Sequence, residues 1–139
     1  KSYKLTYAGN LNNLSLEKNN YIFANGDIAN GELVTGLLKK YNPKCIVNFA
    51  AELHLDRPID GPIDFIQTNI VGTFKLLKVV RGYWSSMNDN KKFKFRCLHF
   101  STDEVYRSLD INQEAFSETS RCMSNSPYSL SKASSDNLV

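Results

Sequence analysis

Two short segments hold side chains that could do chemistry together, Ser126–Asp136 and Ser101–Tyr106. In the first, Tyr128 and Lys132 stand four residues apart. A tyrosine with an ordinary pKa of about 10 is a poor base at neutral pH, but a cation within a few ångströms favours the phenolate and lowers that pKa. Residues four apart share one face of a helix, so Lys132 can assist Tyr128 as a base. The same spacing also occurs on ordinary exposed helix turns.

In the second segment, Asp103 and Glu104 follow each other directly. Two carboxyl groups in different environments can divide into an acid and a base, which an elimination requires and a plain alcohol oxidation does not. The alternative is that Asp103 caps the following turn and Glu104 is solvated. Ser101 and Thr102, just before them, could donate hydrogen bonds to a substrate oxygen. Together the two segments predict a redox enzyme that also performs an elimination.

The elements that must position these side chains follow from alternating strand and helix patterns. Short apolar runs predict strands, and apolar positions at helical spacing predict helices. The predicted order is a strand at 20–24, a helix at 31–41, a strand at 45–50, a helix at 63–84, a strand at 95–100 and a helix from Pro127. This order indicates an α/β fold, a doubly wound parallel sheet with helices on both faces. The apolar runs at 45–50 and 95–100 indicate strands that are covered on both sides.

The predicted site lies beyond the carboxyl ends of the strands, where open α/β sheets bind ligands. Asp27, Ala51–Glu52 and Ser101–Glu104 each follow a predicted strand. The sequence begins at a strand-to-loop junction and ends inside a helical pattern. We therefore expect residues 1–139 to form one incomplete domain of a longer protein.

The overall charge argues against a nucleic-acid partner. The 139 residues carry 17 basic and 14 acidic side chains, and the net charge of +3 is small and evenly spread. We interpret the cluster Lys91–Arg96 as a solvated loop that leads into a strand, rather than as a basic patch with interleaved aromatic residues. Asn88–Asn90 before it is predicted to be a surface turn.

The cysteines and histidines predict no metal site, because they lack ligand spacing. Cys45 and Cys97 lie in apolar runs and are predicted to be core residues, while Cys122 lies in a polar loop. His99 is interpreted as a packed core histidine, and His54 as a residue that could touch substrate. Scattered cysteines, no apolar stretch of transmembrane length and no signal pattern lead us to expect a cytoplasmic protein without a membrane partner.

Five segments resemble one enzyme family, the dTDP-glucose 4,6-dehydratases of the extended short-chain dehydrogenase/reductases. They are Lys4–Leu11, Ala50–Arg57, Phe65–Thr73, Ser101–Tyr106 and Ser126–Asp136. Tyr-x-x-x-Lys indicates only the superfamily, whereas Thr-Asp-Glu is the feature that points to the 4,6-dehydratases. The resemblance covers almost the whole chain and implies a Rossmann-like sheet, present as a partial NAD-binding domain that carries the catalytic residues.

The resemblance implies NAD-dependent dehydration of dTDP-glucose, by oxidation at C4, elimination across C5–C6 and reduction at C6. Tyr128, assisted by Lys132, would take the C4 hydroxyl proton, and Thr102 would hydrogen-bond the C4 oxygen. Glu104 would remove the C5 proton, while Asp103 would protonate the departing C6 hydroxyl. The alternatives are a related sugar-nucleotide epimerase or decarboxylase, and a non-catalytic truncated relative.

The resemblance also implies where NAD and a second subunit would bind. The implied NAD contacts are Lys4, Leu5 and Thr6 near the adenosine ribose, Asp27 and Ile28 at the adenine, Phe49, Ala50, Ala51, Glu52, Leu53 and Thr68 along the ribose and pyrophosphate, and Tyr128 and Lys132 at the nicotinamide ribose. A homodimer is expected through the helices at 63–84 and 127–139. Apolar residues agree with that interface, although a core-facing stripe explains them equally well: Phe74, Val80, Tyr83 and Trp84.

The chain departs from the family pattern at several positions. Tyr3 stands where the family has an acidic residue, Leu53 replaces a serine, Arg107 replaces a glycine, and Pro58 also differs. The Gly-rich phosphate loop and the C-terminal part that binds the sugar nucleotide are absent from these residues. We therefore expect the 139 residues alone to be inactive.

Overall fold

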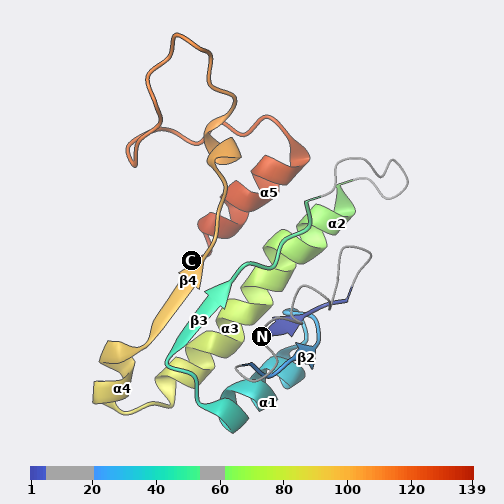
Figure 1. Cartoon of the computed structure of the whole chain (residues 1–139), viewed down its shortest axis with the longest axis vertical. Helices are drawn as coiled ribbons and strands as arrows, with labels where there is room; N and C mark the ends of the chain where they lie inside the picture. Colours follow the sequence, from blue (N-terminus) through green and yellow to red (C-terminus); the bar gives the residue numbers. More distant parts are fainter. Residues whose placement is uncertain (6–20, 54–61) are drawn as a thin grey trace.

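The computed structural model describes residues 1–5, 21–53 and 62–139 (Figure 1). Strands and helices alternate along the chain, as predicted. The elements are β1 (Ser2–Tyr3), β2 (Ala24–Asn25), α1 (Gly31–Tyr41), β3 (Cys45–Asn48), α2 (Ile63–Phe65), the π-helix η2 (Ile66–Gly72), α3 (Thr73–Ser85), α4 (Asp89–Lys94), β4 (Arg96–His99), the 3-10 helix η3 (Asp103–Tyr106) and α5 (Pro127–Asp136). Among the described residues, no helix is long and apolar enough to cross a membrane.

The strands form two parallel pairs, β1 with β2 and β3 with β4. In the second pair, Ile46 lies opposite Cys97 and Asn48 lies opposite His99. The backbone pairing continues one step further, because the Phe100 N–H donates to the Asn48 carbonyl at 3.1 Å. Parallel pairing is confirmed, and the carboxyl ends of β3 and β4 therefore lie at one edge.

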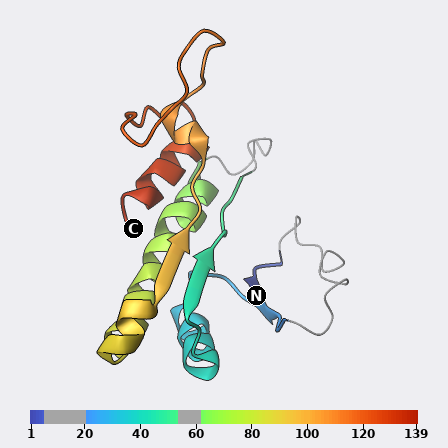
Figure 2. The same ribbon diagram turned by 60° about the vertical axis from the view of Figure 1, so that its left-hand side comes forward.

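The helices α1, α3 and α5 lie on one side of the β3–β4 pair (Figures 1 and 2). The core on that side contains Leu76 and Val80 of α3 with Phe95, and Ile46 and Cys97 of the strands pack against it. Side chains alternate between the two faces of a strand, so the next residues along β3 and β4 point away from these helices.

The opposite face of the pair is open in the described part of the chain. Val47 and Leu98, which pair across the strands, are 46% and 51% exposed. The prediction of strands covered on both sides is therefore wrong for the described residues. Cys45, on the same open face, is exposed and not the core residue that its apolar run predicted.

The predicted helix at 63–84 is observed as α2, η2 and α3 in one continuous rod (Figure 1). Some residues of its apolar stripe are buried in the core, and others are exposed to solvent. Val80 is buried in the core, and the Tyr83 hydroxyl donates to the Pro43 carbonyl at 3.2 Å. Phe74 and Trp84 are exposed. The stripe is thus partly a core stripe, and the dimer interface stays a prediction.

The segment before β4 differs from the prediction. A surface turn and a solvated loop were expected, but Asp89–Lys94 forms the short helix α4. The Asn88 side chain accepts the Lys91 N–H at 3.0 Å and so caps this helix. Asparagine favours both turns and helix N-caps, and here the cap prevails.

Candidate active site

The carboxyl end of β4 leads directly into the predicted acid and base. Thr102 caps η3, since its hydroxyl accepts the Glu104 N–H at 3.4 Å. Asp103 and Glu104 are exposed and line a cavity of about 340 Å³. The other lining residues are Arg107, Ser108, Leu109, Phe116 and Asn125. Both carboxyl groups thus face a space that could hold a sugar-sized ligand.

Tyr128 and Lys132 lie on the first turns of α5. Ser126 begins this helix with a capping box, in which its side chain accepts the Ser129 N–H at 3.0 Å and its own N–H donates to the Ser129 hydroxyl at 3.1 Å. Tyr128 is 8% exposed and Lys132 is 3% exposed. The alternative of an ordinary exposed helix turn is therefore wrong.

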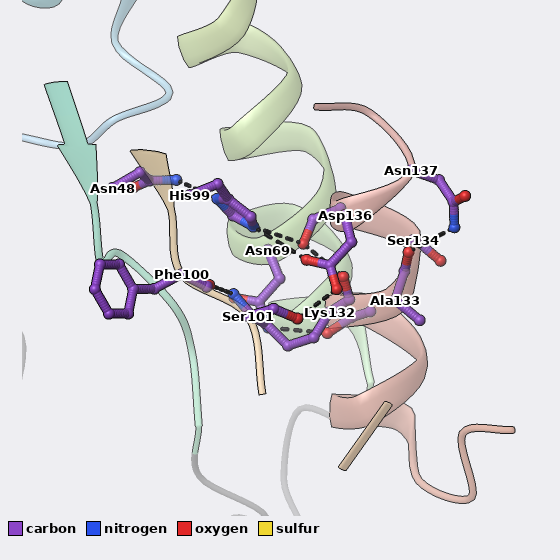
Figure 3. Close-up of polar contacts among 12 residues, drawn as sticks. Asn48, Asn69, His99, Phe100, Ser101, Lys132, Ala133, Ser134, Asp136 and Asn137 are labelled. Carbon is purple, nitrogen blue, oxygen red and sulfur yellow. Dashed lines mark hydrogen bonds and ion pairs between the residues drawn. The ribbon is translucent and has the colours of Figure 1, made fainter. Parts of the chain in front are cut away.

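The two side chains do not interact in the predicted way. Lys132 Nζ donates to the Phe100 carbonyl at 2.5 Å (Figure 3), and burial lowers the pKa of its ammonium group against the opposing effect of Asp136. Burial and then the charge of Glu104 raise the pKa of Tyr128, while a hydrogen bond with Thr102 lowers it. The predicted lowering of the Tyr128 pKa by Lys132 is wrong in this structure, because the ammonium group is held by Phe100.

Asn69 joins the loop after β3 to α5, and the sequence analysis missed this role. Its side chain is buried, with 1% exposed, in the middle of η2. Its Oδ1 accepts the Glu52 N–H at 2.8 Å, and its Nδ2 donates to the Glu52 carbonyl at 3.1 Å and to the Ser131 hydroxyl at 2.9 Å. A polar residue at an apolar position of the helical stripe was the signal that could have revealed it.

The predicted adenine end of the cofactor site contains an ion pair. Lys4 Nζ lies 2.9 Å from Asp27 Oδ2, and this contact raises the pKa of Lys4. Burial acts to raise the pKa of Asp27, but the Ala29 N–H, which donates to Oδ1 at 2.8 Å, and the Lys4 ammonium lower it overall. The negative charges of Asp64 and Glu52 also raise the pKa of Lys4, by less than Asp27 does.

Close packing joins the neighbouring residue Ile28 to the π-helix. A Cβ atom added to Gly72 would lie 3.2 Å from Ile28 Cδ1. Gly72 therefore allows the segment after β2 to approach η2, where Thr68 is also located. Thr6, His54 and Pro58 lie outside the described residues.

The loop after β3 presents apolar side chains beside polar ones. Phe49 and Leu53 are exposed, and the Phe49 ring lies 4.0 Å from the Phe100 ring between centroids. Ala50 and Ala51 are half-buried between them. Apolar side chains can contact the rings of a dinucleotide, and carboxylate and hydroxyl groups can hydrogen-bond its ribose. The residues present therefore fit a dinucleotide. Among residues 1–5, 21–53 and 62–139, no His, Cys, Asp and Glu group suits a metal ion.

Arg107, which stands where the family pattern has a glycine, has an unusual backbone conformation. Its φ of 91° and ψ of −176° lie in a region that is almost restricted to glycine. The residue also lines the cavity beside Glu104. Leu53 is exposed in the loop after β3, and Tyr3 is in β1.

The chain is similar to known proteins along its whole length. The sequence model of the family described as GDP-mannose 4,6 dehydratase matches residues 1–139. A curated dTDP-glucose 4,6-dehydratase from Xanthomonas campestris pv. campestris (strain B100) is 56% identical over 137 residues, which are 97% of this chain and 39% of that protein. The chain thus spans about two-fifths of the length of this relative.

Two solved structures of proteins named dTDP-glucose 4,6-dehydratase have the same fold. The dTDP-glucose 4,6-dehydratase of Bacillus anthracis str. Ames in complex with NAD has a TM-score of 0.80 and 40% identity, over 99% of this chain and 39% of that one. The enzyme of Streptomyces venezuelae with NAD and TYD bound has a TM-score of 0.80 and 37% identity, with the same coverage of 99% and 39%. The chain therefore belongs to the family described as GDP-mannose 4,6 dehydratase and has the Rossmann fold of its dTDP-glucose 4,6-dehydratase relatives.

Proposed function

We propose that the protein carrying this chain is an NAD-dependent dehydratase that converts dTDP-glucose to the 4-keto-6-deoxy sugar. The observation that carries the proposal is one site that holds Tyr128 together with Asp103 and Glu104. Both carboxyl groups line the cavity, and both act electrostatically on the phenol. Relatives named dTDP-glucose 4,6-dehydratase, and neighbours with bound NAD and TYD, support the choice of substrate and cofactor.

The buried residues prepare the oxidation. Tyr128 accepts the C4 hydroxyl proton, and Thr102, which hydrogen-bonds the phenol, orients that exchange. Bound NAD would supply the hydride acceptor at C4 and the hydride donor at C6, and the positive charge of its ring would favour the phenolate. Lys132, held on the Phe100 carbonyl beside the loop after β3, would contact the nicotinamide ribose rather than lower the pKa of the phenol.

The exposed carboxyl groups perform the elimination. The C4 ketone acidifies the C5 hydrogen, and Glu104 removes that proton. Asp103 donates a proton to the C6 hydroxyl, which leaves as water, so that a C5–C6 double bond forms. A hydride that bound NAD would supply at C6, together with a proton returned to C5, would complete the 4-keto-6-deoxy sugar. Each proton transfer of the elimination is thus assigned to one carboxyl group. General acid–base steps of this kind typically contribute about 10²–10⁴-fold in rate.

Isotope transfer tests the proposal on the protein at its full natural length. With dTDP-glucose deuterated at C4, the label should move to C6 of the product, and in heavy water C5 should acquire solvent deuterium. An epimerase would keep the C6 hydroxyl, and a decarboxylase would release carbon dioxide from a uronic acid substrate. A protein that binds neither NAD nor dTDP-glucose would be a non-catalytic relative, and the proposal would be wrong.

A matched pair of variants tests the assigned base. Glu104→Gln should lower the dehydration rate by about 10²–10⁴-fold. Glu118→Gln makes the same chemical change at an exposed residue that does not line the cavity, and its rate should equal that of the unmodified protein. Equal rates for the two variants would show that Glu104 is not the base.

A further inference from the structure

His99 is a buried titratable residue that the proposed reaction does not use. Its side chain, with 6% exposed, lies between the ends of β3 and α5 (Figure 3). Its Nδ1 lies 3.1 Å from Asn48 Nδ2, and its Nε2 lies 3.2 Å from the Ser135 hydroxyl and 3.5 Å from Asp136 Oδ1. Both ring nitrogens thus have polar partners.

The partners fix which ring nitrogen carries the proton. Asn48 Oδ1 accepts the Ala50 N–H at 3.1 Å, so the other end of this amide, Nδ2, must donate to His99 Nδ1. Nδ1 is therefore an acceptor without a proton. The Ser135 hydroxyl donates to the Lys132 carbonyl at 2.8 Å, so its oxygen is left to accept from His99 Nε2. The ring is neutral, with its proton on Nε2.

These bonds run in one direction from the loop after β3 to the helix that carries Lys132. The donor order is Ala50 N–H, Asn48 amide, His99 ring and Ser135 hydroxyl, with the Lys132 carbonyl as the last acceptor. The two residues after His99 also contact α5. Phe100 accepts from Lys132 Nζ, and the Ser101 hydroxyl donates to Asp136 Oδ2. Consecutive residues at the end of β4 thus hold one face of α5.

We propose that neutral His99 is a positioning residue, which locks α5 to the carboxyl ends of β3 and β4 and thereby places Lys132 and Tyr128 for NAD binding. The consequence for NAD rests on the proposed function, whereas the position of the ring proton does not. A second proton on Nδ1 would face the donor hydrogens of Asn48 and break the sequence of donors. The charged groups that face the ring are Lys132 and Asp136, both on α5.

The first test observes the ring proton directly. Nitrogen-15 NMR of the full-length protein, labelled in histidine and assigned with His99→Gln, should show a proton on Nε2 and none on Nδ1 at neutral pH. A ring with its proton on Nδ1, or with two protons, would overturn the proposal. This spectrum needs neither NAD nor turnover, so it stays informative if the proposed dehydration is wrong.

Conservative variants distinguish the Asn48–His99 hydrogen bond from the His99–Ser135 hydrogen bond. In His99→Asn the amide oxygen occupies the place of Nδ1 and keeps the bond from Asn48, whereas in His99→Gln the amide nitrogen reaches the place of Nε2 and keeps the bond to Ser135. We expect His99→Asn and His99→Phe to weaken NAD binding by about 3–10-fold, the equivalent of one net hydrogen bond, and His99→Gln to restore most of the affinity. Calorimetric titration with NAD measures this. Equal affinities for all three variants would overturn the proposal.

A double-mutant cycle provides the matched control. Ser135→Ala and Ser134→Ala remove hydroxyls that donate in the same way, to the Lys132 and Leu130 carbonyls, each at 2.8 Å, and only Ser135 contacts His99. With His99→Phe, the effects on NAD affinity should be non-additive for Ser135→Ala by about 3–10-fold and additive for Ser134→Ala. A purely structural role would lower the free energy of unfolding without this coupling in NAD affinity, and additive effects in both cycles would therefore contradict the positioning role.

Discussion

Replacing Arg107 by glycine should stabilise the protein, although it removes a side chain. With φ at 91° and ψ at −176°, the Arg107 backbone occupies a region in which a non-glycine residue costs about 1–3 kcal/mol. Glycine removes that strain, but it also makes the unfolded chain more flexible, which costs about 0.4–1 kcal/mol. The net gain expected for glycine over alanine at this position is therefore about 0–2.6 kcal/mol in the free energy of unfolding.

The comparison of Arg107→Gly with Arg107→Ala isolates the backbone, because both variants lose the whole guanidinium side chain. Ser108 provides the matched control, since it is the next residue and lines the same cavity, but is not among the described residues with positive φ. There, glycine should be less stable than alanine by about 0.4–1 kcal/mol. Denaturation in urea measures all four variants at full length. If glycine is also the less stable residue at position 107, the strain argument is refuted.

Other predictions concern the buried polar groups. Asn69→Ala leaves the partly buried Glu52 N–H without its acceptor and should lower the free energy of unfolding, measured in urea, by about 1–3 kcal/mol. Asn112→Ala, at an exposed residue whose side chain makes no hydrogen bond to the described residues, should change it by less than about 0.5 kcal/mol. Glu104→Gln removes a charge that raises the pKa of Tyr128, so tyrosinate absorbance, taken as a difference from Tyr128→Phe, should show that pKa lowered; an unchanged pKa would contradict the electrostatic coupling. Burial and then Lys132 lower the pKa of His99 below its ordinary value of about 6.5, so the folded state binds this proton less readily than the unfolded state. Its contribution to stability is complete above about pH 6.5 and is lost as pH falls towards the folded pKa, and unfolding measured over this range should lose that dependence in His99→Gln.

The sequence predicted the topology because periodicity reports which side chains are buried together. The helical spacing that includes Phe65 and Val80 correctly predicted one long helix, and Val80 packs with the strands. Parallel strands bring their carboxyl ends to one edge, and the positions of Asp27 and of Thr102–Glu104 after strands are the reason that a site was predicted there.

Features that depend on distant contacts were not predictable in this way. Nothing within the Tyr-x-x-x-Lys spacing indicates that Lys132 bonds to Phe100, which lies 32 residues earlier. The exposure of Val47 and Leu98 likewise depends on what covers the sheet, and an apolar run does not identify its cover. Asn69 carried a local signal, since a polar residue interrupted an apolar stripe, but its partners came from two other segments.

The open face of the β3–β4 pair makes the stability of this fold depend on its surroundings. Four exposed apolar residues lie on or beside this face, Val47, Phe49, Leu98 and Phe100, and the rings of Phe49 and Phe100 lie 4.0 Å apart between centroids. Anything that binds the folded state through such a surface stabilises it by mass action, and the gain increases with the logarithm of its concentration once that concentration exceeds the dissociation constant. The melting temperature of these 139 residues therefore depends on which molecule binds that face and at what concentration.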